Sequence, residues 1–182
     1  MAEINLTKFT RLDTEFCVSL DEAKSHLRIF ETDEDVQVQF LINAACEYIE
    51  LYTHRRLQRS SYSLTGSVQA GEKVYLPYGV TVITAIKGTP YQEAERPLQV
   101  NIDYKMIGDD VVVFLASFEG LSIDVECGYP FDRVPKILVY AVLMMLGTLY
   151  ECKQDISYGI QAYQMPFTTK NLMAPFINWI KV

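Results

Sequence analysis

The stretch that decides the fold runs from Ser19 to Arg56 and reads SLDEAKSHLRIFETDEDVQVQFLINAACEYIELYTHRR. It begins with a serine that is followed three residues later by Glu22, the pattern of a capping box at a helix N-terminus. Acidic residues at 33–35 indicate a second helix start, because carboxylates are stabilising at the positive end of the helix dipole. The sequence therefore predicts helices over about 19–30 and 33–56.

Apolar residues in the second helix recur every four residues, which places them on one face. The two adjacent rows are Val36, Phe40, Ala44 and Tyr48, and then Leu41, Ala45, Ile49 and Tyr52. Together they predict a wide apolar stripe along this helix. Residues 1–17, before the first helix, show little periodicity and are read as a lead-in segment.

The periodicity changes over residues 60–127. Apolar and polar residues alternate strictly in 121–127, LSIDVEC, as expected for a half-buried antiparallel strand. Pro77-Tyr78-Gly79 is a turn signal, and Gly108-Asp109-Asp110 is a short hairpin connection between two runs of strand-forming residues. This region predicts a small antiparallel sheet with hairpins.

A third helix is predicted over about 135–152, with Pro135 at its first position. Residues 137–146 are apolar on all sides, which predicts a helix buried under the sheet or against another subunit. The predicted fold is α+β but mainly α: a helix pair, a small sheet, a long buried helix and an extended tail. One domain is expected over 1–153, followed by a C-terminal docking tail over 154–182.

Composition excludes several classes of protein. The 182 residues are 49% hydrophobic and 21% charged, as in globular domains, so a disordered chain is excluded. The net charge of −7 gives no overall attraction for phosphates. The start of the chain shows no signal peptide, and the longest apolar run is too short to cross a membrane. The cysteines at 17, 46, 127 and 152 are expected to be reduced thiols.

A search for catalytic and metal-binding patterns finds none, and no enzymatic activity, metal or cofactor is predicted. His26 and His54 have no cysteine or second histidine at the spacing of metal ligands. The acidic residues at 33–35 are more simply explained by the helix dipole, and Asp109-Asp110 by the hairpin. Catalytic carboxylates leave little trace in a sequence, so a small enzyme or ligand-binding domain stays open as an alternative.

Two groups of residues are candidates for contacts with partners. Arg55, Arg56 and Arg59 form the densest basic patch, which would contact a phosphate or carboxylate, or only complement the helix dipole and pair locally. The last 30 residues are poor in charge, and such a segment folds back on its own domain or docks on a partner. Its candidate anchors are apolar: Phe167, Leu172, Met173, Phe176 and Trp179.

Several stretches resemble the head–tail connector (adaptor, or head-completion) proteins of long-tailed bacteriophages. They are VSLDEAKSHLR at 18–28, the block at 33–50, YTHRRL at 52–57, VYLP at 74–77, VECGYP at 125–130 and NLMAPFINW at 171–179. The order and spacing of these stretches carry the resemblance. Two departures are His54, where the family usually has glycine, and Ile177-Asn178, where the tail usually has arginines.

The resemblance implies a structural subunit of the phage neck that forms a ring, a dodecamer in the virion. Such a ring joins the portal protein to the stopper or tail-completion proteins, and double-stranded DNA passes through it without sequence-specific binding. The implied locations are the head–tail junction of the virion and, during assembly, the host cytoplasm.

For the two candidate groups, the resemblance predicts that the apolar anchors dock on the portal or a neighbouring subunit. It also predicts that the basic patch makes inter-subunit salt bridges or approaches DNA. Another neck component, such as a stopper, is the alternative within the same class.

Overall fold

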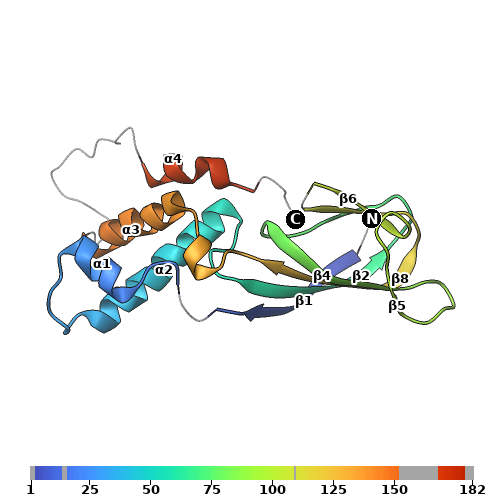
Figure 1. Ribbon diagram of the computed structural model, residues 1–182, viewed down its shortest axis with the longest axis horizontal. Coiled ribbons are helices and arrows are strands. Elements are labelled where there is room, and N and C mark those ends of the chain that lie inside the picture. The colour runs from blue at the N-terminus through green and yellow to red at the C-terminus, as the bar shows by residue number, and fades with distance from the viewer. Residues whose placement is uncertain (1–2, 14–15, 109, 152–167, 179–182) are drawn as a thin grey trace. The chain divides into compact units, whose positions relative to one another are not determined.

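The computed structural model describes residues 3–13, 16–108, 110–151 and 168–178. The chain divides into two compact units. The sheet unit holds the described residues within 1–14, 54–130 and 178–182, and the helical unit holds those within 15–53 and 131–177 (Figure 1). The domain boundary expected at residue 153 falls outside the described residues.

The sheet unit contains two antiparallel sheets. The larger has the strand order β1-β2-β8-β4-β5, with bounds Glu3–Arg11, Ser60–Val68, Phe118–Cys127, Val80–Thr89 and Arg96–Pro97. The smaller has the order β3-β7-β6, with bounds Lys73–Tyr75, Val111–Phe114 and Tyr104–Ile107. The predicted hairpin is confirmed as β6–β7, and Gly108 adopts the positive φ of 66° that its turn requires.

One hydrophobic core joins the two sheets. Leu121, Ile123, Val125 and Cys127 are buried, which confirms the alternation predicted for β8. The smaller sheet contributes Phe114, whose ring meets that of Phe118 edge-on at 6.0 Å between centroids. This core spans strands that lie far apart in the sequence, so it fixes the register of β8 between β2 and β4.

An ion pair closes the loop between β5 and β6. Arg96 donates to both carboxylate oxygens of Asp103, at 2.9 and 2.7 Å, and the Gln99 backbone N–H donates to the same carboxylate at 2.9 Å. The Asp103 side chain is buried, and these donors, Arg96 first, lower its pKa. The folded state therefore favours the ionised carboxylate.

Asp103→Asn is expected to lower the free energy of unfolding at pH 7 by about 1–2 kcal/mol, because charge-assisted hydrogen bonds are lost. A carboxylate whose pKa is lowered on folding stabilises the folded state at pH values above its unfolded-state pKa, about 4. It loses this contribution as the pH falls through its folded-state pKa. The difference between wild type and variant should therefore shrink between pH 7 and pH 3 in urea denaturation. An unchanged difference at pH 3 would show that the carboxylate charge is not the cause.

The helical unit packs three main helices against one another, α1 (Leu20–Leu27), α2 (Asp35–Thr53) and α3 (Lys136–Glu151), with the short α4 (Thr169–Met173) against α3 and α2 (Figure 1). Two 3₁₀ turns, Phe131–Arg133 and Ala174–Phe176, complete the unit. The predicted capping box is confirmed: the Ser19 hydroxyl accepts from the Glu22 N–H, and the Glu22 carboxylate accepts from the Ser19 N–H.

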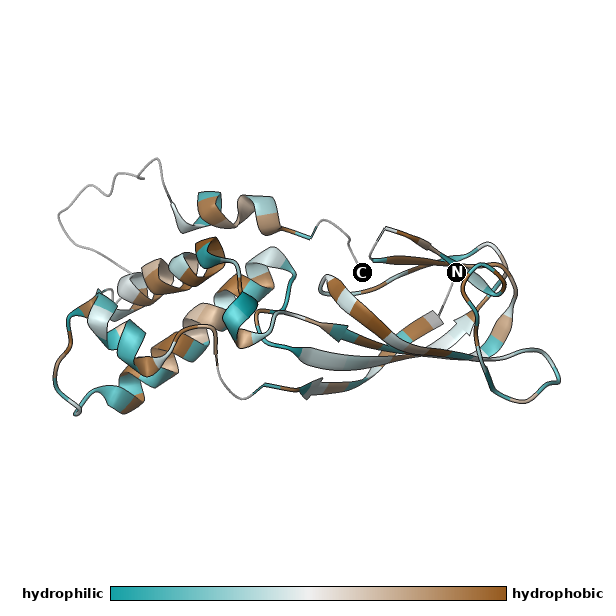
Figure 2. Cartoon of the chain, in the orientation of Figure 1, coloured by the Kyte–Doolittle hydropathy of each residue, from teal (hydrophilic) through white to brown (hydrophobic). Residues whose placement is uncertain are grey.

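The interior of the helical unit lies where α2 and α3 face each other. Its buried residues include Val38, Ile42 and Ile49 of α2 and Leu138 and Leu146 of α3. Hydrophobic residues continue along most of α3 (Figure 2). Within the single chain Ile137 and Tyr140 on that helix are about half exposed.

The prediction of a mainly α fold is wrong, because the structure is about 35% helical and 34% strand, with two antiparallel sheets. Two misreadings cause the difference. The lead-in segment forms β1, a complete edge strand, and the central region forms a five-stranded and a three-stranded sheet. The helices are also shorter than predicted, since α1 ends at Leu27 and α2 begins at Asp35.

His54 ends α2 in the left-handed conformation, with φ at +51°. This conformation costs an L-residue about 1 kcal/mol and costs glycine little. His54→Gly is therefore expected to raise the free energy of unfolding by about 1 kcal/mol in urea denaturation. Gln39→Gly, inside the exposed face of α2, is the control and should lower it by a similar amount. A loss of stability in His54→Gly would contradict the strain at this helix end.

Candidate functional site

Arg56 is held among three aromatic rings of the sheet unit. Its guanidinium carbon lies 4.4 Å from the ring centroid of Tyr78, 5.1 Å from that of Phe9 and 5.9 Å from that of Tyr62. Its Nε donates to the Tyr62 hydroxyl at 2.5 Å. Cation–π attraction and this hydrogen bond fix the orientation of the guanidinium before any partner arrives. We call Phe9, Tyr62 and Tyr78 the aromatic cage.

The rings of the aromatic cage also stack on one another. Tyr62 lies between Phe9 and Tyr78, with centroid distances of 5.0 and 5.1 Å. Burial raises the pKa of the Tyr62 hydroxyl, against the opposing effect of Arg56, so the group stays a neutral phenol. Tyr78 has a φ of +63°, which is rare for a bulky residue and marks a position held by its surroundings.

A pocket of about 290 Å³ opens beside the cage. It is lined by Arg55, Arg56, Tyr78, Gly79, Val80, Thr81, Gly128 and Tyr129. Arg55 reaches over Gly79, where an added Cβ would stand 2.6 Å from a guanidinium nitrogen. Two guanidinium groups therefore line one concavity in an otherwise acidic chain. A cleft lined by one sign of charge attracts anions.

The three arginines of the predicted basic patch have different surroundings. Arg55 and Arg56 line the pocket together, whereas Arg59 pairs with Glu126 of β8 at 3.0 Å. The aromatic cage could not be predicted from the sequence, because its members come from β1, β2 and the turn before β4. The one local signal was the Pro77-Tyr78-Gly79 turn, which positions a ring rather than only reversing the chain.

Residues 168–177 of the C-terminal segment pack within the helical unit. Met173 is fully buried, while Leu172 and Phe176 are half-buried. Thr168 caps α4, and its hydroxyl accepts from the Asn171 N–H at 3.4 Å. Phe167 and Trp179 lie outside the described residues. Of the two open possibilities for this segment, the part around Met173 folds back on its own chain.

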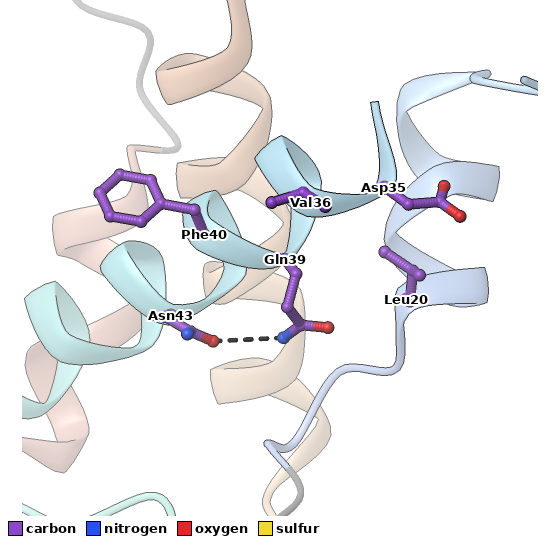
Figure 3. Close-up of a pocket in the computed structure, with 6 residues that line it drawn as sticks. All are labelled: Leu20, Asp35, Val36, Gln39, Phe40 and Asn43. Carbon is purple, nitrogen blue, oxygen red and sulfur yellow. Dashed lines mark hydrogen bonds between the residues drawn. The ribbon is translucent and has the colours of Figure 1, made fainter. Parts of the chain in front are cut away.

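An exposed apolar surface lies at the N-terminal end of α2. Val36 and Phe40 are 85% and 70% exposed, and Figure 3 shows both side chains pointing from α2 away from Leu20 of α1. They line a shallow pocket of about 450 Å³, beside the 3.2 Å hydrogen bond between Gln39 and Asn43. The apolar row predicted to begin with Val36 and Phe40 is therefore outside the core at the N-terminal end of α2. Clustered exposed apolar residues are typical of protein contacts.

The acidic residues at the start of α2 have structural partners. Asp35 accepts from Lys24 at 2.6 Å, and Glu34 accepts from the Tyr150 hydroxyl at 2.7 Å. This bond to Glu34 is the main cause that raises the pKa of Tyr150. Among the described residues no group of three histidine, cysteine or acidic side chains could hold a metal ion.

Three of the four cysteines lie in the described part of the chain. Cys17, Cys46 and Cys127 are buried and form no disulfide, and Cys152 falls outside the described residues. No helix among the described residues combines the length and the apolar character that a membrane crossing requires.

Comparison with known proteins finds a family match that covers parts of both units. Residues 17–96, which include α1, α2 and the strands β2, β3 and β4, match the family described as phage gp6-like head-tail connector protein. No curated protein matches the chain in sequence.

Three solved structures resemble the whole chain, each over 97% of this chain and 97% of its own. A chain in the neck of an empty gene transfer agent particle, computed with C6 symmetry, has a TM-score of 0.71 at 21% identity. A chain in the virion of the native particle has a TM-score of 0.67 at 20% identity. A chain in the neck of the native particle, computed with C12 symmetry, has a TM-score of 0.64 at 20% identity. At such identities the likeness shows a common fold. Residues 17–96 match the model of the phage gp6-like head-tail connector family, which confirms the resemblance to head–tail connector proteins that was inferred from the sequence.

Proposed function

We propose that this chain is a structural subunit of a phage neck, where it joins the DNA-filled head to the tail. The observation that carries the proposal is the family match over residues 17–96, which agrees with the fold shared along 97% of the chain with neck proteins. Both halves of the chain contribute, because the shared fold includes the sheet unit and the helical unit. The role is architectural, and the chain is proposed to have no enzymatic activity.

A ring of twelve copies is the proposed assembly. The two similar necks were computed with C6 and C12 symmetry, and a ring with twelvefold symmetry also satisfies sixfold symmetry. Each copy would bring a charge of −7, so the ring would repel DNA phosphates. A channel of that kind lets double-stranded DNA pass without sticking.

The contacts within the neck are also proposals. The exposed apolar surface around Val36 and Phe40 would be covered by a neighbouring protein in the assembled neck. The C-terminal segment would dock on the portal or a neighbouring subunit. Leu172 and Phe176 are the half-buried anchors among the described residues, and Phe167 and Trp179 are the proposed anchors outside them. The opposite side of the ring would receive the stopper or tail-completion protein.

Disruption of the gene in the parent phage tests the proposal. Electron microscopy of the lysate is expected to show free tails beside unjoined heads that are empty or leaking DNA, with the gene on a plasmid restoring joined particles. The chain would then work in the virion, after assembly in the host cytoplasm. Normal virions from the disrupted phage would refute the neck function.

A further inference from the structure

We propose that the exposed apolar surface at the start of α2 is covered by the start of α3 of a second copy of this chain. The α2 surface consists of the exposed large apolar side chains within 30–40, which are Phe30, Val36 and Phe40. The α3 surface consists of those within 131–140, which are Phe131, Ile137 and Tyr140. The inference rests on the proposed neck function, since it names the neighbour that covers the α2 surface in the ring.

The two surfaces lie at opposite ends of the α2–α3 helix pair, and both belong to the helical unit. The Tyr150 hydroxyl, near the end of α3, donates to Glu34, just before α2, at 2.7 Å. From Tyr150 back to Ile137 the helix axis runs about 20 Å. The two surfaces of one copy are therefore too far apart to cover each other.

A closed ring needs two different surfaces on every copy. When a ring has more than two members, each copy meets the next through a head-to-tail contact between unlike surfaces. Two exposed apolar surfaces at opposite ends of one compact unit have the arrangement that such a contact requires. A second copy can therefore cover both surfaces with one repeated contact.

The α2 surface lies among acidic residues. Residues 28–36 carry four acidic side chains and one basic side chain. Glu34 and Asp35 have partners within the helical unit, in the Tyr150 hydroxyl and the Lys24 ammonium group. Glu31 and Asp33 are exposed. Two carboxylates beside the α2 surface thus face solvent in the single chain.

The charge around the α3 surface has the opposite sign. Residues 131–137 carry two basic side chains and one acidic side chain, in a chain whose net charge is −7. Both basic residues, Arg133 and Lys136, are exposed. Opposite charges around two apolar surfaces steer their encounter and fix the orientation of the contact. This complementarity favours the α3 surface as the occupant over an apolar segment of another protein.

The shapes of the two surfaces also differ. Val36 and Phe40 line the shallow pocket of about 450 Å³ that Figure 3 shows. On the α3 surface, Ile137 and Tyr140 are three residues apart on one helix, so their side chains are neighbours on its surface. In the proposed contact the Tyr140 ring enters the pocket, because an exposed aromatic side chain is a typical anchor of a protein interface.

Photo-cross-linking in particles of the parent phage tests the proposal. A phenylalanine analogue with a benzophenone group replaces Phe40 and forms bonds to C–H groups that it touches. The product is expected on a denaturing gel at twice the chain mass of 20.8 kDa, with the link mapped to 131–140 of the second copy. The same analogue at Tyr91, which is as exposed as Phe40 at 70%, is the matched control and should form no link to that range.

Charge exchange gives an independent measurement. Glu31→Lys combined with Asp33→Lys places like charges across the contact and should lower the yield of joined particles about tenfold. Arg133→Glu combined with Lys136→Glu does the same from the other side. All four substitutions together restore opposite charges, so the yield should return close to that of the wild type. Unchanged yields in both pairs, or an equal loss in all three variants, would contradict the charge complementarity.

The other cross-linking results overturn the proposal. A link from position 40 to a different protein would assign the α2 surface to that protein. A link only to another part of the second copy, or no link, would refute the α3 surface as the occupant, as would an equal link to 131–140 from position 91. Absence of the chain from purified particles would instead refute the neck function, and with it the neighbour named here.

Discussion

Gly128→Ala is expected to lower the free energy of unfolding by about 3 kcal/mol, through backbone strain and overpacking together. Gly128 follows β8 with a φ of +89°, and a Cβ there would stand 2.1 Å from the backbone carbonyl oxygen of Gln58. Because the obstructing atom belongs to the backbone, it can move only if the Gln58–Tyr129 bridge between the two segments opens. Urea denaturation of the two proteins measures the difference.

Gly71→Ala separates the backbone strain from the overpacking that are expected together in Gly128→Ala. Gly71 has a similar φ of +85°, but no atom lies within 4 Å of the added Cβ. This control should cost only the strain of the left-handed conformation, about 1 kcal/mol. Equal losses in the two variants would show that the close approach of Gln58 to Gly128 contributes nothing, and the packing described here would be wrong at that point.

Met173→Ala is expected to cost about 3 kcal/mol of unfolding free energy, the typical effect of truncating a buried methionine. Met173 is fully buried although it belongs to the C-terminal segment, and α4 packs on α3. Lys170→Ala, at an exposed position of the same helix, is the control and should change stability by less than about 0.5 kcal/mol. Thermal or urea denaturation of the full chain measures both variants.

The outcome bears on the role of the C-terminal segment. A large loss in Met173→Ala would mean that residues around α4 belong to the core of the helical unit. Truncation after Gln154, which removes α4, would then weaken the fold as well as any docking by the C-terminal segment. No loss in Met173→Ala would mean that α4 is not held on α3 in solution, and the burial of Met173 would be contradicted.

Local signals in the sequence predicted the elements that depend on local chemistry. The capping box at Ser19 and Glu22, the alternation of 121–127 and the turn at Gly108 each produced the expected structure. In each case neighbouring residues carry the whole cause: a side chain that satisfies helix N–H groups, a two-residue period, or a positive φ.

Tertiary pairing determined what the sequence did not predict. Residues 5–11 of β1 are exposed and Ile4 is partly buried, so this stretch shows no alternation of buried and exposed residues. The edge strand forms because it pairs with β2. The Val36 and Phe40 row has helical spacing, but the buried face of α2 runs through Val38, Ile42 and Ile49. Spacing alone locates an apolar row and does not say which row meets α3.

The candidate site was predicted only in part for the same reason. The run of basic residues at 55, 56 and 59 indicated a patch, but the division between them depends on distant residues. Arg59 pairs with Glu126, while Arg56 makes cation–π contacts with Phe9, Tyr62 and Tyr78. Cation–π contacts across three segments leave no pattern in a single sequence.

Localised reconstruction of the neck in particles of the parent phage tests the central claim most directly. The account predicts density for this fold in a ring of twelve copies at the single vertex that joins head and tail, with both the sheet unit and the helical unit present in every copy. A neck built without this chain, or this chain found only elsewhere in the particle, would contradict it.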